Sequence, residues 1–141
     1  MTPLVSQILS RAFATLGEQE VSGTKSNSTI LGWIRAWFPK QNDDSTIAWC
    51  AIWTSTIMSE CGLPVPPTPF RAYSWRLWGT LREGEPQLGD VVVLTRSGGH
   101  HVAVCLRVTK DSFWGISGNS KNAVSVDKYD RKRIVAVRSP E

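Results

Sequence analysis

Apolar positions near the N-terminus recur with the period of an α-helix. In residues 3–16 every fourth position of one stripe is hydrophobic, namely Leu4, Ile8, Ala12 and Leu16. This stripe predicts an amphipathic helix, with Pro3 in its first turn and Gly17 at its end. A second, shorter helix is predicted over residues 30–38, because Pro39 cannot continue it.

The same period is clearest in residues 45–61, where it relates Cys50, Trp53, Thr54, Ile57, Met58 and Cys61. Ser45 or Thr46 can cap this predicted helix, and Gly62 followed by Pro64 is typical of a helix end. Cys50 therefore falls in the first turn or two of the helix, and Cys61 falls in the last turn.

After residue 89 the hydrophobic pattern changes to the alternation that is typical of strands. Before this change, residues 72–80 predict one more short helix. Strands are predicted over residues 90–96, 100–108, 112–118, 123–129 and 134–140, with turns at residues 97–99 and 109–112. Helices followed by an antiparallel meander indicate an α+β fold.

The composition is that of a globular protein with one domain over residues 1–141. Hydrophobic residues make up 41% of the chain and charged residues 20%. No apolar run approaches the roughly 20 residues that cross a bilayer, so we expect no stable membrane insertion. The N-terminus lacks a basic stretch followed by a long apolar one, so we expect synthesis in the cytoplasm without a signal peptide.

The formal net charge is +4, and much of it lies in residues 128–138. A basic segment of this kind is either a solvated face or an attraction to a polyanion such as nucleic acid or an anionic cell wall. The chain has no nucleic-acid-binding motif, so nucleic acid is not an expected partner.

The three cysteines differ in their predicted surroundings. They form no Cys-x-x-Cys pair, which argues against a zinc or redox site. Cys50 lies where helix N–H groups stabilise a thiolate, although a helical cysteine is also a common buried hydrophobe. Cys61 lies at the helix C-terminus and Cys105 in an apolar strand, and both places disfavour a thiolate.

Both histidines of the chain stand side by side where a glycine turn opens into a strand, at His100 and His101. Alternation places His101, Ala103, Cys105 and Arg107 on one face and the valines on the other, which is a core face. Small residues on the His101 face leave room for a neighbour or a substrate. His100 points the other way or lies in the turn, where it is exposed. Asn119, after the next strand, either orients a histidine through its amide oxygen or forms a turn.

The motifs AWCAIWTSTIMSECGL, LGDVVV, GGHHVAV and GISGNS, in this order, resemble those of the NlpC-type and CHAP cysteine amidase-peptidases. The resemblance extends over residues 17–140 and is greatest to the small branch that contains phage endolysins. It implies a papain-like fold in which the nucleophile helix packs on an antiparallel sheet. It also implies that Cys50 is the nucleophile, His101 the general base and Asn119 the orienting residue, whereas Asp90 is structural. His100 departs from the single histidine of the family pattern.

The resemblance further implies a peptidoglycan substrate, cut at an amide of the stem peptide or at the muramoyl-alanine bond, with no metal or cofactor. The enzyme is expected to be a monomer that acts on the wall, in the periplasm, after release. Seven tryptophans are many for this length, and Trp49, Trp53 and Trp114, with His100, are candidate substrate-binding residues, as are Trp75 and Trp78. No wall-binding domain is expected.

Three other readings remain open at this stage. The same chemistry suits a secreted antibacterial amidase toxin. A non-catalytic wall-binding module can retain the fold, and a cysteine enzyme of this kind can act on cytosolic protein instead. Every enzymatic reading requires the Cys50 sulfur to lie within hydrogen-bonding reach of the His101 ring.

Overall fold

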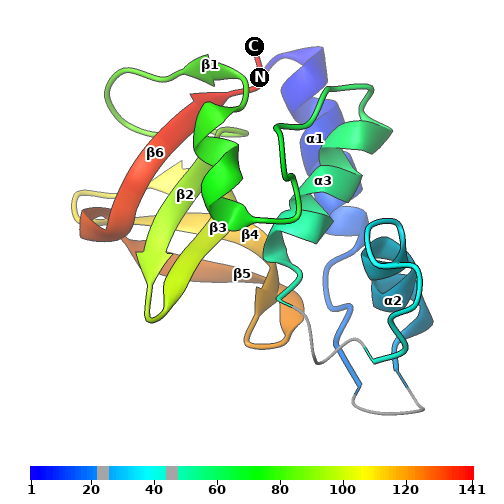
Figure 1. Ribbon diagram of the computed structural model, residues 1–141. Helices are drawn as coiled ribbons and strands as arrows, with labels where there is room; N and C mark the ends of the chain where they lie inside the picture. The colour runs from blue at the N-terminus through cyan, green and yellow to red at the C-terminus, as the bar shows by residue number, and fades with distance from the viewer. Residues whose placement is uncertain (22–25, 44–47) are drawn as a thin grey trace.

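The helices lie on one side of a strongly twisted antiparallel sheet, as Figure 1 shows for the computed structural model. Residues 1–21, 26–43 and 48–141 are described. The elements are, in chain order, α1 (Pro3–Ala14), α2 (Ser28–Arg35), α3 (Cys50–Glu60), the 3-10 helix η2 (Ala72–Leu77), β1 (Thr80–Leu81), β2 (Val91–Arg96), β3 (Gly99–Val108), β4 (Ser112–Ser120), β5 (Ala123–Asp130), the 3-10 helix η3 (Arg131–Arg133) and β6 (Ile134–Ser139). The α+β fold class is confirmed. No helix among the described residues is long and apolar enough to cross a bilayer.

α1 and α2 begin and end within about three residues of the predicted positions, whereas α3 begins at Cys50, about five residues later than predicted, with Trp49 as its N-cap residue. Thr2 caps α1 by accepting a hydrogen bond from the backbone N–H of Val5, and Asn27 caps α2 in the same way. α3 ends at Glu60, and Gly62 follows in the left-handed region with φ 75°, as expected from the sequence. Ser45 and Thr46, the expected caps of α3, lie outside the described residues.

The sheet departs from a simple meander at its last strand. Strands β2 to β5 pair in sequence, but β6 returns to pair with β2, which gives the order β1-β6-β2-β3-β4-β5. The sequence pattern predicts β6 but not its partner, because alternation does not specify which strand lies beside which. The short strand β1, which the sequence analysis missed, extends this edge by pairing with β6.

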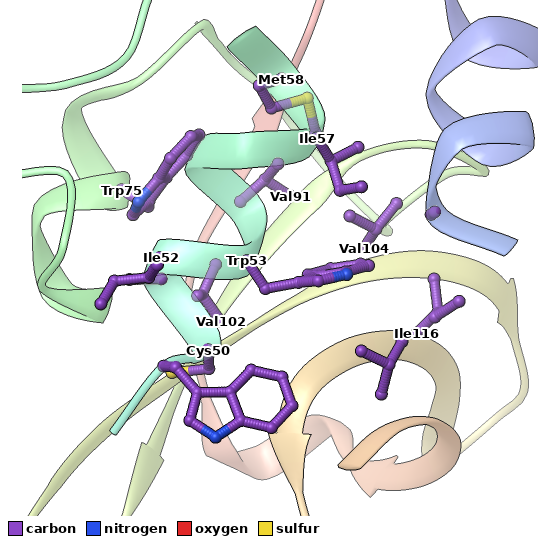
Figure 2. Close-up of a cluster of buried hydrophobic side chains, with 14 of the residues drawn as sticks. Cys50, Ile52, Trp53, Ile57, Met58, Trp75, Val91, Val102, Val104 and Ile116 are labelled. Atoms are coloured by element: carbon purple, nitrogen blue, oxygen red, sulfur yellow. The ribbon is translucent and has the colours of Figure 1, made fainter. Parts of the chain in front are cut away.

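Two apolar clusters lie on opposite faces of β2 and β3. The helix-facing cluster holds Val102 and Val104 against α3, and Figure 2 shows Trp53 and Ile57 of that helix directed toward these strands. The second cluster, on the opposite face, includes Ala103 and Cys105. The predicted alternation along β3 is therefore confirmed, but the His101 face is filled by packed side chains and is not open.

α3 approaches β4 closely because residue 118 has no side chain. A Cβ on Gly118 would lie 2.5 Å from the Cβ of Trp53 and 2.9 Å from the ring of Trp49. Glycine at this position therefore allows the start of α3, which carries Cys50, to pack against the sheet.

Candidate active site

Cys50 is the first residue of α3, where the N–H groups of the helix are not yet paired along the chain. Its side chain is 3% exposed, and burial raises the pKa of its thiol. The backbone N–H groups of Val102, Ala51 and Cys50 and the positive charge of Arg96 oppose that effect. The thiol is therefore a buried group whose pKa is raised overall, although several donors and one cation act in the opposite direction.

His101 lies near the start of β3. It directly precedes Val102, whose backbone N–H faces the Cys50 thiol. Nε2 of the ring is 2.9 Å from Oγ of Ser117 and 3.3 Å from the hydroxyl of Tyr129. Nδ1 is buried and has no hydrogen-bond partner among the described residues. Of the two ring nitrogens, Nδ1 is thus the one that is free to accept a proton from a reacting group.

The protonation state of His101 follows from its surroundings. Burial lowers its pKa to about 4, with help from the charges of Arg96 and Arg133, while Asp127 acts in the opposite direction. The ring is therefore neutral at pH 7, which is the state that a general base requires.

Cys50 lies beside Val102, the chain neighbour of His101, where the pairing of β3 with β4 ends. Pairing between β3 and β4 runs from Val104–Ile116 to Val108–Phe113, so His101 and Val102 lie beyond its end. The thiol of Cys50 approaches the backbone of Val102 there, and Figure 2 shows the two residues side by side. Within the described part of the chain, the thiol and Nδ1 of His101 are not hydrogen-bonded to each other, so the direct contact expected from the sequence is not formed in this state.

Asn119 does not take the place expected for it. It lies at an irregularity of the β4–β5 pairing with φ 55°, and the described partners of His101 are Ser117 and Tyr129 instead. Ser117, two residues earlier in β4, is fully buried beside the ring. The sequence analysis missed Ser117 and Tyr129 because serine and tyrosine give no motif, although alternation places Ser117 on the same face of β4 as Gly115.

A groove of about 300 Å³ opens beside Cys50. Its lining residues are Ala48, Cys50, Phe70, Arg71, Ala72, Tyr73 and His100. The His100 and Tyr73 rings stack with their centres 4.4 Å apart. The guanidinium of Arg76 lies 3.9 Å from the centre of the same Tyr73 ring. The structure therefore brings His100 to Cys50, and it adds Tyr73 and Arg71, which the sequence analysis did not single out.

The prediction that tryptophans line the substrate groove is wrong for four of them. Trp49 and Trp53 are fully buried, and their indole N–H groups donate to Glu20 and to Thr15. Trp75 and Trp78 are also buried and donate to backbone carbonyls. These four rings belong to the core because each has an interior partner for its N–H group.

Trp114 also lies away from Cys50. It is 39% exposed and lines a different hollow, together with Lys128 and Tyr129. Its position on β4 explains this, because Trp114 pairs with Lys128 near the end of the strand that is remote from Ser117.

Asp90 has the structural role that the resemblance implies. It is fully buried, and both of its oxygens accept hydrogen bonds from Arg82, at 2.9 and 3.1 Å. It also accepts from the backbone N–H of Gln87 and so closes the turn before β2. Throughout residues 1–21, 26–43 and 48–141, no three His, Cys, Asp or Glu side chains are grouped as metal ligands would be.

Comparison with known proteins gives a limited result. The sequence matches no protein-family model and no curated protein. A solved structure described as "The crystal structure of Ly7917" is similar to this chain, with a TM-score of 0.47 and 20% sequence identity over 96% of this chain. The chain spans 62% of the length of that protein.

Proposed function

We propose that the protein is a cysteine amidase-peptidase that hydrolyses an amide bond of bacterial peptidoglycan. The observation that carries the proposal is the placement of Cys50 at a helix start, beside the strand that holds a neutral histidine with one free ring nitrogen. A nucleophilic thiol with a base and backbone donors close to it are the parts that acyl transfer needs. Of these, Cys50 lines the groove, whereas His101 is buried outside the groove lining. The peptidoglycan substrate comes from the sequence resemblance.

The reaction begins when Sγ of Cys50 attacks the amide carbonyl carbon. Nδ1 of His101 takes the thiol proton, for which the two groups must approach as the substrate binds; such contacts tighten in the substrate complex of many enzymes. The carbonyl oxygen becomes an oxyanion, which backbone N–H groups at the start of α3 stabilise. His101 then gives its proton to the leaving amine, and a thioester remains on Cys50.

Water completes the cycle. His101 removes a proton from a water molecule as the water oxygen attacks the thioester carbon. The carbon–sulfur bond breaks, the free carboxylic acid leaves, and the proton returns to the Cys50 thiol. No external reductant or oxidant is required, since the net reaction adds one water across one amide bond.

The groove has chemistry that suits a peptidoglycan stem. Tyr73 and His100 present a flat aromatic wall, on which a peptide backbone or a sugar ring can pack. Arg71 is exposed at the same groove and is suited to bind a carboxylate of the stem. The net charge of +4 favours approach to an anionic envelope. We propose that the protein acts there as a monomer, outside the cytoplasm.

The test is digestion of purified sacculi with identification of the released fragments by mass spectrometry. The wild-type protein is expected to release muropeptides, and the new amine and carboxyl ends identify the bond. Cys50→Ala is expected to release none, whereas Cys61→Ala, at the other end of the same helix, should act like wild type. Equal release by wild type and Cys50→Ala would exclude this mechanism, and binding without release by wild type would indicate a wall-binding module.

A further inference from the structure

A continuous row of hydroxyl groups connects His101 to a carboxylate on β5. The hydroxyl of Ser117 is 2.9 Å from Nε2 of His101 and 3.0 Å from the hydroxyl of Tyr129. Tyr129 donates to Oγ of Ser120 at 3.3 Å, and Ser120 donates to Asp127 at 2.6 Å. We call the side chains of Ser117, Tyr129 and Ser120 the hydroxyl relay.

Asp127 is the fixed end of this row. Its Oδ2 also accepts a hydrogen bond from Ser125 at 2.5 Å, and Lys121 pairs with its Oδ1 at 3.5 Å. These serine donors and Lys121 lower the pKa of the Asp127 carboxyl, although burial acts against them. An ionised carboxylate is an acceptor only, so it cannot donate a hydrogen back into the relay.

The direction of each hydrogen bond follows from that end. Ser120 gives its hydrogen to Asp127, so its oxygen accepts from Tyr129. With its hydrogen given to Ser120, the Tyr129 oxygen can only accept, from Ser117 at 3.0 Å and from Nε2 of His101 at 3.3 Å. In a row in which every hydroxyl donates toward Asp127, the Ser117 hydrogen goes to Tyr129, and the Ser117 oxygen accepts from Nε2 of His101. Because the Ser117 oxygen is the acceptor of this hydrogen bond, the ring proton of His101 lies on Nε2.

We propose that Asp127, acting through the hydroxyl relay, fixes His101 in the tautomer that is protonated on Nε2 and leaves Nδ1 as the base. Asp127 and Ser120 are thus positioning residues, and they do the work that an asparagine or carboxylate does by direct contact in other cysteine enzymes. The catalytic consequence rests on the proposed function, but the tautomer itself does not.

The charged groups around His101 do not provide the same selection. Arg96 on β2 and Arg133 on η3 disfavour the protonated ring, and Asp127 favours it through space. Cys50 approaches from α3, and it raises the pKa of Tyr129 by its charge, after the larger effect of burial. These effects act on the charge of the ring, whereas only a directed hydrogen bond distinguishes its two nitrogens.

The tautomer is measured directly from nitrogen chemical shifts of protein labelled with 15N-histidine at pH 7. The chain has two histidines, so His100→Gln assigns the spectrum. Wild-type His101 is expected to be protonated mainly on Nε2. Ser120→Ala interrupts the relay but keeps the Asp127 charge, and Asp127→Ala removes the final acceptor; both are expected to raise the Nδ1-protonated population severalfold. Asp111→Ala, which removes an exposed carboxylate outside the relay, should leave it unchanged.

The reactivity of Cys50 provides a second readout that needs no peptidoglycan. Ser120→Ala should slow alkylation of Cys50 by iodoacetamide about tenfold, the usual size of an effect on an orienting partner, and leave Cys61 unchanged. A wild-type ring protonated on Nδ1, or a tautomer that Ser120→Ala does not alter, would overturn the proposal. A change of the His101 tautomer in Ser120→Ala that is absent in Asp127→Ala would also overturn the proposal. Neither measurement depends on hydrolysis of sacculi, so a failure of the proposed function is seen separately.

Discussion

Cys50 and Cys105 are both buried cysteines, but their surroundings give the two thiols different chemistry. Cys105 lies within β3, where burial and the charge of Asp90 raise its pKa to about 12 and only one backbone N–H, that of Arg107, opposes them. Burial raises the pKa of Cys50 too, but three backbone N–H groups and Arg96 oppose it there. The two buried thiols therefore differ in the donors and charges that face them, and we expect these surroundings, as well as exposure, to set their reactivity.

The largest expected difference is in alkylation of the folded protein by iodoacetamide. A pKa of about 12 against an ordinary 9.0 leaves Cys105 with about a thousandfold less thiolate than a free thiol, whereas the base proposed for Cys50, His101, lies next to the strand residue that the Cys50 thiol faces. Peptide mass mapping against time should show Cys50 labelled and Cys105 unmodified until the protein unfolds. In the His101→Ala variant, alkylation of Cys50 should be slower, whereas the rate of alkylation of Cys61 should not change. Labelling of Cys105 as fast as Cys50 would contradict this account.

The second prediction concerns the histidine that lies on the Cys105 face of β3. The folded state holds the pKa of His101 at about 4, against an ordinary 6.5. As the pH falls through this window the unfolded chain binds the proton first, so the folded protein loses stability from pH 6.5 to 4. The loss approaches about 3 kcal/mol in the free energy of unfolding.

Urea denaturation at a series of pH values measures this loss. His101→Gln should remove the part of the pH dependence that belongs to this residue and give a flatter curve than wild type. If wild type and His101→Gln have the same dependence between pH 6.5 and 4, His101 is not held neutral by the fold.

The sequence predicted the elements around both cysteines better than it predicted their neighbours. The period of residues 45–61 placed Cys50 at a helix start, and alternation placed Cys105 and His101 on one face of a strand, because both patterns are local. The partners of His101 come from β4 and β5, and their register depends on an irregularity after Ser117 that no local pattern specifies.

The tryptophans were misjudged for a related reason. An aromatic ring suits a core as well as a groove, and the choice depends on distant partners such as Glu20 for Trp49. Tyr73 was overlooked because its role depends on a stack with His100, 27 positions later along the printed sequence.

The third prediction compares two glycines of β4, of which Gly118 packs against α3 and Gly115 pairs with Cys105. Gly118→Ala places a methyl group 2.5 Å from Trp53, in the helix that begins at Cys50, and should lower the free energy of unfolding by about 2 kcal/mol and slow alkylation of Cys50. Gly115, which pairs with Cys105, has its nearest neighbours at 3.2 Å, so Gly115→Ala should cost less and leave Cys50 unchanged. Thermal or urea denaturation with the same labelling assay measures both effects, and equal behaviour of the two variants would refute the distinction.

The smallest effect is expected at Trp53, on the helix that carries Cys50. Trp53→Phe keeps an aromatic ring but loses the 2.9 Å hydrogen bond to Thr15, which should cost about 1 kcal/mol of stability. Because Trp53 is buried and does not line the groove, the Michaelis constant for wall fragments should not change. A raised Michaelis constant in Trp53→Phe would instead indicate that Trp53 contributes to substrate binding.

The two-residue turn between β2 and β3 has a consequence for the paired histidines. Its register sets Leu94 opposite His101 and Thr95 opposite His100, and so sends one imidazole into the protein and the other to the groove wall. Adding a residue to β3 before His100 and keeping the strand paired would exchange the two rings between interior and rim. The length of this hairpin therefore decides which histidine is buried beside Ser117 and which one lines the groove.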